Sequence, residues 1–325
     1  MLDFRTGQIF GLLLRTLPFL ALRIAVYVGV TLAYVLAVGV GGGMGYLFGS
    51  IGGNTGGGAG IGALIGFAIV SGALYWARQY LLYLVKAGHI AVLVELLDGR
   101  PIPAGKGQLD FASGIVKQHF ATSSLLFGLH QLVRGILRVF NRLTVSIASW
   151  LPIPGLDVLV KLVDAVISTG LSSLDQVILA QILRKPTNNP WAVARDSVVL
   201  YAQNYKSVLK NAAFLTLIVW GLTLLIWILV GIPIAALVGL FHVHGFWPIV
   251  LALIAALSLK AALIDPFATV ALIQVYDKVT AGQTPNPEWS GRLETMSGKF
   301  RELTQKARDA GASPPAAGVG LPPAG

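Results

Sequence analysis

The fold of this chain is decided by residues 212–241, which read AAFLTLIVWGLTLLIWILVGIPIAALVGLF and contain no charged side chain over 30 residues. A helix needs about 20 apolar residues to cross the hydrocarbon core of a bilayer, so this run predicts a spanning helix that is tilted or kinked at Pro233. Only 12% of the whole chain is charged, whereas soluble domains carry about 25% charged residues. The sequence therefore predicts an integral membrane protein of the helical kind.

Three further apolar runs predict three further spans. The first covers about residues 17–40, the second begins at Ile61 and continues to Leu97, and the last begins at Trp247. A glycine-rich connection joins the first two spans, and the short turn 242–246 joins the last two. We therefore expect an all-α integral membrane protein with about four transmembrane helices in two hairpins, plus amphipathic interfacial helices.

The basic residues that flank these spans fall on one side of the predicted membrane. They are Arg5, Arg15, Arg23, Arg78, Lys86, Arg100, Lys106, Arg195, Lys206, Lys210 and Lys278. The connections on the other side, residues 41–60 and 242–246, contain no Lys or Arg. Cytoplasmic connections carry the excess of basic residues, so this pattern predicts a multi-pass protein of the plasma (inner) membrane with both termini cytoplasmic. The same bias explains the net charge of +10, and we expect no nucleic-acid partner.

Composition divides the chain into four segments. Residues 1–110 are expected to form an N-terminal membrane hairpin with a glycine-rich loop, and residues 111–190 to form amphipathic cytoplasmic or interfacial helices. Residues 191–300 are expected to form a C-terminal membrane hairpin. Residues 301–325 are expected to be a disordered tail, because Ala, Gly and Pro dominate from Gly311 onward.

The segment 111–190 contains two amphipathic patterns. In the first, apolar residues recur at helical spacing, and Arg134, Arg138 and Arg142 follow one another four residues apart on the opposite face. An arginine at the centre of a membrane helix costs about 2.5–3.5 kcal/mol, so three together predict a helix in the membrane interface, with the arginines on anionic lipid headgroups. The second pattern covers residues 156–183, and its polar side carries Asp157, Lys161, Asp164 and Asp175.

Glycines recur at every fourth position through the connection between the first two spans. One row is Gly41, Gly45, Gly49, Gly53 and Gly57, and the other is Gly58, Gly62 and Gly66. On a helix such a row lets another backbone approach closely, which favours a packed hairpin, an oligomer seam or a pore wall. The alternative is a flexible loop around Asn54, because glycine is a poor helix former. We assign helix packing to Gly45, Gly49, Gly53, Gly62 and Gly66, with a turn near Gly52–Gly58.

Two ionisable residues, Lys260 and Asp265, interrupt the fourth span. An ionisable group inside a span is a functional candidate; the alternative is that Lys260 reaches back to the membrane surface and Asp265 already lies at the boundary. A spacing of five does not place them on one face of an α-helix, but Pro266 can loosen the geometry. Trp220 and Trp227 could cage a quaternary ammonium group. These four residues are the candidate substrate-binding residues.

No residue pattern supports catalysis or a cofactor. His242 and His244 are two potential metal ligands in one short turn without a nearby carboxylate, which is a weak pattern for a metal site. The chain has no cysteine, and no paired carboxylates or Ser-His-Asp set occur in a convincing context. We therefore expect no enzyme, no cofactor and no metal centre.

From Ser124 onward, the order of short motifs resembles the C-terminal half of the choline transporter-like family. The motifs are Ser124-Leu125-Leu126-Phe127-Gly128 followed by Arg134 and Arg138, Tyr201-x-x-Asn204-Tyr205-x-Ser207, Lys210-Asn211-Ala212-Ala213-Phe214-Leu215, and Asp277 to Pro285. They span roughly the last 200 residues, and the family's pair of adjacent acidic residues is represented only by Asp277. The resemblance implies a shared fold in this half and transport of a choline-like cation.

Two functional hypotheses follow. The first is a transporter or channel for a small solute, with a choline-like cation as the candidate, that uses the interface between the hairpins. The second is a non-transporting oligomeric scaffold, in which the glycine rows drive assembly and the basic helices bind lipid or a partner membrane protein. The expected partners are thus the lipid bilayer, a second copy or another membrane protein, and a small-molecule solute.

Overall fold

The computed structural model describes residues 3–103, 105–120, 123–146, 173–184, 189–240 and 246–312, and within these ranges all regular secondary structure is helical. Four segments are long and apolar enough to cross a membrane: Leu17–Ile51, Thr55–Gly72, Tyr205–Leu237 and Pro248–Thr280. The protein is therefore an all-α, multi-pass membrane protein, and the prediction made from the apolar runs is confirmed.

Packing divides the chain into two units. The first, here called the hairpin unit, consists of Thr6–Gly114 and Leu215–Val270. The second, here called the amphipathic unit, consists of Met1–Arg5, Ile115–Phe214 and Ala271–Gly325. Each unit thus combines parts of the chain that are distant in sequence, whereas the four segments expected from composition follow one another along the chain.

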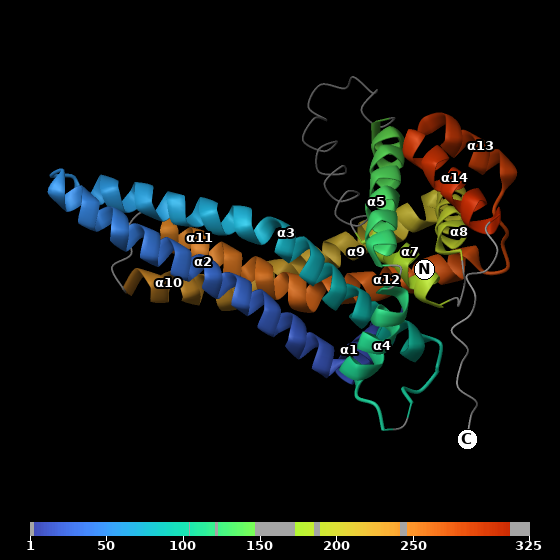
Figure 1. Ribbon diagram of the computed structural model, residues 1–325. Helices are drawn as coiled ribbons and strands as arrows, with labels where there is room; N and C mark the ends of the chain where they lie inside the picture. The colour runs from blue at the N-terminus through green and yellow to red at the C-terminus, as the bar shows by residue number, and fades with distance from the viewer. Residues whose placement is uncertain are drawn as a thin grey trace, which may run out of the picture. The chain divides into compact units, whose positions relative to one another are not determined.

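The first hairpin consists of α2 (Leu17–Ile51) and α3 (Thr55–Leu97), which run side by side (Figure 1). Both are continuous helices through the glycine-rich stretch. The chain reverses within three residues, where Gly53 has a φ of +71°, a left-handed conformation that favours glycine. Asn54 then caps α3, because its side chain accepts a hydrogen bond of 2.9 Å from the backbone N–H three residues later.

Glycines on α2 and α3 lie where the two backbones meet. A Cβ added to Gly45 would lie 2.9 Å from the Cα of Gly62, and a Cβ added to Gly62 would lie 2.9 Å from the Cα of Gly45. A Cβ on Gly58 would lie 2.8 Å from the Cα of Gly49, and Gly66 faces the α2 backbone in the same way. Real Cβ atoms do not come this close to backbone, so only glycine fits at these positions.

Gly53 does not take part in the contact between α2 and α3, although its place in the four-residue spacing predicted that it would. It lies in the turn, and nothing lies within 4 Å of the position that its Cβ would occupy. The helical spacing ends with α2 at Ile51, so the residues after it leave the row. The structure thus moves Gly53 from helix packing to chain reversal, within the turn expected near Gly52–Gly58.

Each of the last two spans is built from three helical pieces. These are α9 (Tyr205–Ile226), the π-helical turn η2 (Trp227–Gly231) and α10 (Ile232–Leu240), and then α11 (Trp247–Leu259), the π-helical turn η3 (Lys260–Ile264) and α12 (Asp265–Thr280). Each π turn ends two residues before a proline, Pro233 or Pro266. Proline lacks an N–H and its ring clashes with the carbonyl four residues earlier, so a wider turn accommodates it. The break expected at Pro233 therefore takes the form of a π turn.

The hairpin unit exposes large apolar side chains along its helices. They include Leu32, Leu36, Leu47, Phe48, Leu224, Leu229, Leu237, Leu253 and Leu257. Water would not favour an apolar surface this extensive, whereas lipid tails solvate it well. The exposed surface of the unit therefore agrees with a position in the bilayer.

The hairpin unit also contains α1 (Thr6–Arg15) and the first part of α4 (Gln108–Phe120). Near the start of α2 and the end of α3, Phe19, Val92 and Ala112 are buried together. This small core joins α4 to the first hairpin.

In the amphipathic unit, α5 (Ser123–Ser146) packs against four other helices. They are α7 (Leu174–Arg184), α8 (Pro190–Gln203), α13 (Pro287–Met296) and α14 (Gly298–Ala312). The apolar face of α5 is buried, with Leu129 and Ile136 at most 1% exposed, while Arg134 and Arg138 are exposed. Protein, rather than lipid, thus covers the face that was expected on the membrane, because α7 and α14 supply apolar partners that sequence spacing does not reveal.

Three other expectations for this unit concern Arg142, residues 156–172 and residues 301–312. The side chain of Arg142 and residues 156–172 of the second amphipathic pattern lie outside the described residues. Residues 301–312, expected in a disordered tail, belong to α14, in which Leu303 and Ala307 are buried. The charged composition of α14 concealed an apolar face at helical spacing.

Candidate functional site

The π turn η3 brings Lys260 and Asp265 together. Residues five apart in an α-helix diverge by about 140° around its axis, so a regular helix would separate these side chains. In η3, the backbone N–H of Asp265 instead donates to the carbonyl of Lys260, five residues earlier. Five residues then make a little more than one turn, and Lys260 Nζ lies 2.6 Å from Asp265 Oδ1.

The same turn leaves one backbone carbonyl for another helix. The next donor in the π-helical pattern would be residue 266, which is a proline and has no N–H. The carbonyl of Ala261 therefore lacks its backbone partner and accepts a hydrogen bond of 2.8 Å from the guanidinium of Arg23 on α2. Pro266 thus explains both the ion pair and the docking of Arg23.

His89 on α3 completes the site as a neutral acceptor. Its Nε2 lies 3.0 Å from the hydroxyl of Thr16, whose own proton is directed to the carbonyls of the preceding turn, 3.2 Å away. The hydroxyl therefore accepts, Nε2 carries the ring proton, and Nδ1 can accept from Arg23 at 3.4 Å. Phe19 stacks on the imidazole with ring centroids 5.2 Å apart. We call Arg23, His89, Lys260 and Asp265 the charge cluster.

Arg23 is the most deeply buried member of the charge cluster. Arg23 is 2% exposed, and its Nε has no hydrogen-bond partner among the described residues. The side chains of Lys260 and Asp265 are 27% and 23% exposed. The cluster thus contains two cations and one carboxylate, held by α2, α3 and the span that contains η3.

This arrangement can bind and orient a charged group. Ionisable side chains inside spans are costly and mark solute or ion pathways, and π turns occur often at functional sites. Among the described residues, no group of three or more His, Cys, Asp or Glu could hold a metal ion. The contacts of the charge cluster offer electrostatic recognition and hydrogen bonding.

The two candidate tryptophans lie on the span that precedes Lys260 and Asp265. Trp220 is half-buried in α9. Trp227 is half-buried in η2, and its ring covers Gly231 of the same π turn, where an added Cβ would lie 3.0 Å from Cδ2 of the indole. Arg23 and His89, rather than the tryptophans, hydrogen-bond at the charge cluster.

Sequence reasoning missed Arg23 and His89 as site residues, although a signal was present for Arg23. It was assigned to the basic flank of the first span. However, Arg23, Tyr27 and Tyr34 recur at helical spacing and are all buried in α2. A polar stripe on one face of a span predicts an inward-facing side, so this spacing could have placed Arg23 toward the other helices.

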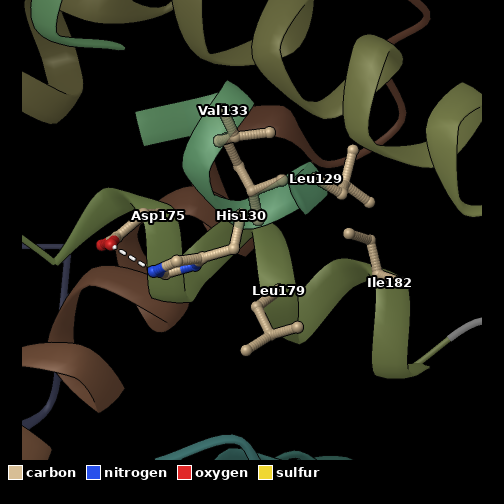
Figure 2. Close-up of a pocket in the computed structure, with 7 residues that line it drawn as sticks. Leu129, His130, Val133, Asp175, Leu179 and Ile182 are labelled. Carbon is tan, nitrogen blue, oxygen red and sulfur yellow. Dashed lines mark ion pairs between the residues drawn. The ribbon is translucent and has the colours of Figure 1, made fainter. Parts of the chain in front are cut away.

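The amphipathic unit contains a second polar pair, at a small pocket between α5 and α7 (Figure 2). His130 Nε2 lies 3.2 Å from Asp175 Oδ2, and Arg134 Nε lies 3.7 Å from the same oxygen. Apolar side chains line the rest of the pocket. Asp175 was expected on a polar face, but it is 7% exposed and joins the two helices electrostatically. Of the arginines expected at lipid headgroups, Arg134 therefore also faces a carboxylate.

Some residues of the motifs that resemble the choline transporter-like family make hydrogen bonds near helix ends in the amphipathic unit. Asp277 accepts hydrogen bonds of 2.8 and 3.0 Å from the guanidinium of Arg184, and Asn211 donates to Asp3 at 2.8 Å. Asn204 donates to Gln283 at 2.7 Å. Tyr201 is buried, and burial raises the pKa of its hydroxyl. These contacts give the motif residues structural roles within the unit.

Comparisons with known proteins add no relative to this description. No family model matches the chain, and neither the curated proteins nor the solved structures include a significant match.

Proposed function

We propose that the protein transports a small solute across the membrane and that the charge cluster is part of its solute site. The observation that carries this proposal is the ion pair of Lys260 and Asp265 at a π turn within an apolar span, joined by the buried Arg23. Replacing a buried ion pair by apolar residues is often neutral or stabilising, so stability alone does not account for these charges. A role in recognising a solute accounts for these charges.

The glycine contacts favour this proposal over the scaffold hypothesis. In that hypothesis, the glycine rows would drive assembly between chains. In the structure, Gly45, Gly49, Gly62 and Gly66 face the partner helix of their own hairpin. Their surface is occupied within one chain, and assembly through a second copy or another membrane protein would need a different surface.

We further propose that the protein lies in the plasma (inner) membrane with both termini in the cytoplasm. The turn that ends α2, with its cap at Asn54, carries no basic residue, whereas basic residues gather at the other ends of both helices. The resemblance to the choline transporter-like family adds a choline-like cation as one solute to test.

The orientation can be tested with single cysteines, because the chain has none of its own. A cysteine at Asn54 is expected to react with a membrane-impermeant thiol reagent added to intact cells, and a cysteine at Gln305 on α14 is expected to react only after lysis. Both positions are exposed, so accessibility to the reagent differs only by side of the membrane. Labelling of the Gln305 variant in intact cells would reverse the proposed orientation.

Transport can be tested with the purified full chain in proteoliposomes. Uptake of radiolabelled choline, ethanolamine, acetate and phosphate is measured against empty liposomes. We expect uptake of one of these solutes, and we expect Asp265→Asn to abolish it, because Lys260 then loses its counter-ion. Asp98→Asn, which alters an exposed ion pair with Arg100, is the matched control and should retain uptake. Equal rates with the Asp265→Asn protein and the unmodified protein would remove the charge cluster from the proposal.

A further inference from the structure

The charges of the cluster do not balance. Arg23 and Lys260 supply two positive charges, whereas among the described residues Asp265 supplies the one negative charge that acts on both of them. Asp265 already lies 2.6 Å from Lys260 Nζ, and its interaction with Arg23 is electrostatic at longer range. His89 is neutral in the tautomer that its hydrogen bonds require. An apolar span thus holds an uncompensated cation, which is costly without an anionic partner.

The guanidinium of Arg23 is satisfied only in part. Its hydrogen-bonding neighbours are the carbonyl of Ala261, Nδ1 of His89 and the hydroxyl of Tyr27, all of which are neutral. Its Nε is buried and has no hydrogen-bond partner among the described residues. An arginine usually meets a carboxylate or phosphate through two adjacent N–H groups, and here one of these groups is left for such a partner.

We propose that the charge cluster binds an anionic oxygen group, a carboxylate or a phosphate, at Arg23, and that the transported solute carries this group. The solute part of this inference rests on the proposed function, whereas the anion site does not. Asp265 offsets only one of the two positive charges of Arg23 and Lys260. A negative charge on an anion at Arg23 offsets the other and makes the cluster neutral. A cation such as choline would add a third positive charge to a site whose carboxylate is occupied by Lys260.

The anion site is tested by thermal unfolding of the full chain in an uncharged detergent, followed by tryptophan fluorescence. Sodium phosphate and sodium acetate are compared with sodium chloride and choline chloride at equal ionic strength. We expect phosphate or acetate to raise Tm by several degrees, because a ligand that binds only the folded state stabilises it. Arg23→Gln should remove this shift. Arg15→Gln changes an exposed arginine eight residues earlier and should retain the shift.

Two further variants keep the test decisive if Arg23→Gln does not fold. Asp265→Asn removes the competing carboxylate, so phosphate or acetate should bind about tenfold more tightly or better, as expected for at least 1.4 kcal/mol of added attraction. Lys260→Met frees Asp265 to neutralise Arg23, so the shift should disappear although Arg23 is intact. Weaker anion binding by Asp265→Asn, or an unchanged shift in Lys260→Met, would overturn the proposal.

Repeating the measurement in nanodiscs distinguishes a soluble anion from a lipid headgroup as the ligand. Nanodiscs of phosphatidylcholine alone test soluble anions, and nanodiscs with added phosphatidylglycerol test a lipid headgroup. An Arg23-dependent shift with phosphate or acetate in phosphatidylcholine supports a soluble anion. A shift with phosphatidylglycerol alone supports the anion site and overturns the anionic solute. Arg23-dependent binding without uptake in proteoliposomes rejects the proposed transport but retains the site, and no Arg23-dependent shift in any arm rejects the site.

Discussion

Replacing Gly45 or Gly62 by leucine is expected to abolish correct folding of the first hairpin. Each glycine faces the backbone of the opposite helix, where even a Cβ would lie 2.9 Å from a Cα atom. Overpacking of side chains alone costs typically 1–3 kcal/mol, and backbone atoms cannot move aside as side chains do, so we expect a larger loss here. Whole domains are stable by only about 5–15 kcal/mol. Expression, detergent sizing and Tm should all fall sharply.

The same helices supply matched controls. Gly43 on α2 and Gly60 on α3 have nothing within 4 Å of the position that a Cβ would occupy. Gly43→Leu and Gly60→Leu are expected to leave Tm unchanged or raise it, because leucine favours a helix by up to about 1 kcal/mol over glycine. If all four variants behave alike in sizing and thermal unfolding, the two helices do not pack through these glycines.

Removing one member of the ion pair at η3 is expected to destabilise the protein more than removing both. Asp265→Leu leaves Lys260 in an apolar span without its counter-ion, and a lysine at the centre of a membrane helix costs about 2.5–3.5 kcal/mol on insertion scales. The double variant Lys260→Met, Asp265→Leu should recover most of this loss, because it leaves neither charge uncompensated. Tm and the midpoint of denaturant unfolding measure both effects.

An exposed ion pair sets the scale for this comparison. Glu95 pairs with Arg100, whose side chain is 49% exposed, and Glu95→Gln should change stability by less than about 1 kcal/mol. We expect the double variant at η3 to fold and yet to transport nothing. A double variant that is no more stable than Asp265→Leu would show that the two charges act independently.

Hydropathy and charge were enough to predict the four spans, because the bilayer imposes length and apolarity on each one. Four-residue spacing also indicated close backbone contact at Gly45 and Gly62, since that rule depends on local helix geometry alone. It failed at Gly53, because spacing cannot show where a helix ends. The turn conformation interrupts the row there.

The charge cluster could be predicted only in part. Lys260 and Asp265 stand out in an apolar run, but a π turn is one of several responses of a helix to Pro266, so their meeting was not predictable from spacing. Arg23 joins them from a position more than two hundred residues earlier, which is a tertiary contact that composition does not encode. The burial of α5 against α7 and α14 was missed for the same reason.

The π turn at Lys260–Ile264 also has a consequence for chain length. Such a turn holds one residue more than the α-helix around it, as if a single residue had been inserted and absorbed locally. Deleting Leu263 would then restore a regular helix and leave Phe267 and Val270 facing the same neighbours, whereas deleting a residue from α11 would rotate all that follows by about 100°. Homologous chains one residue shorter at this point would keep the helix and also the meeting of Lys260 with Asp265, because residues four apart lie on one face of an α-helix.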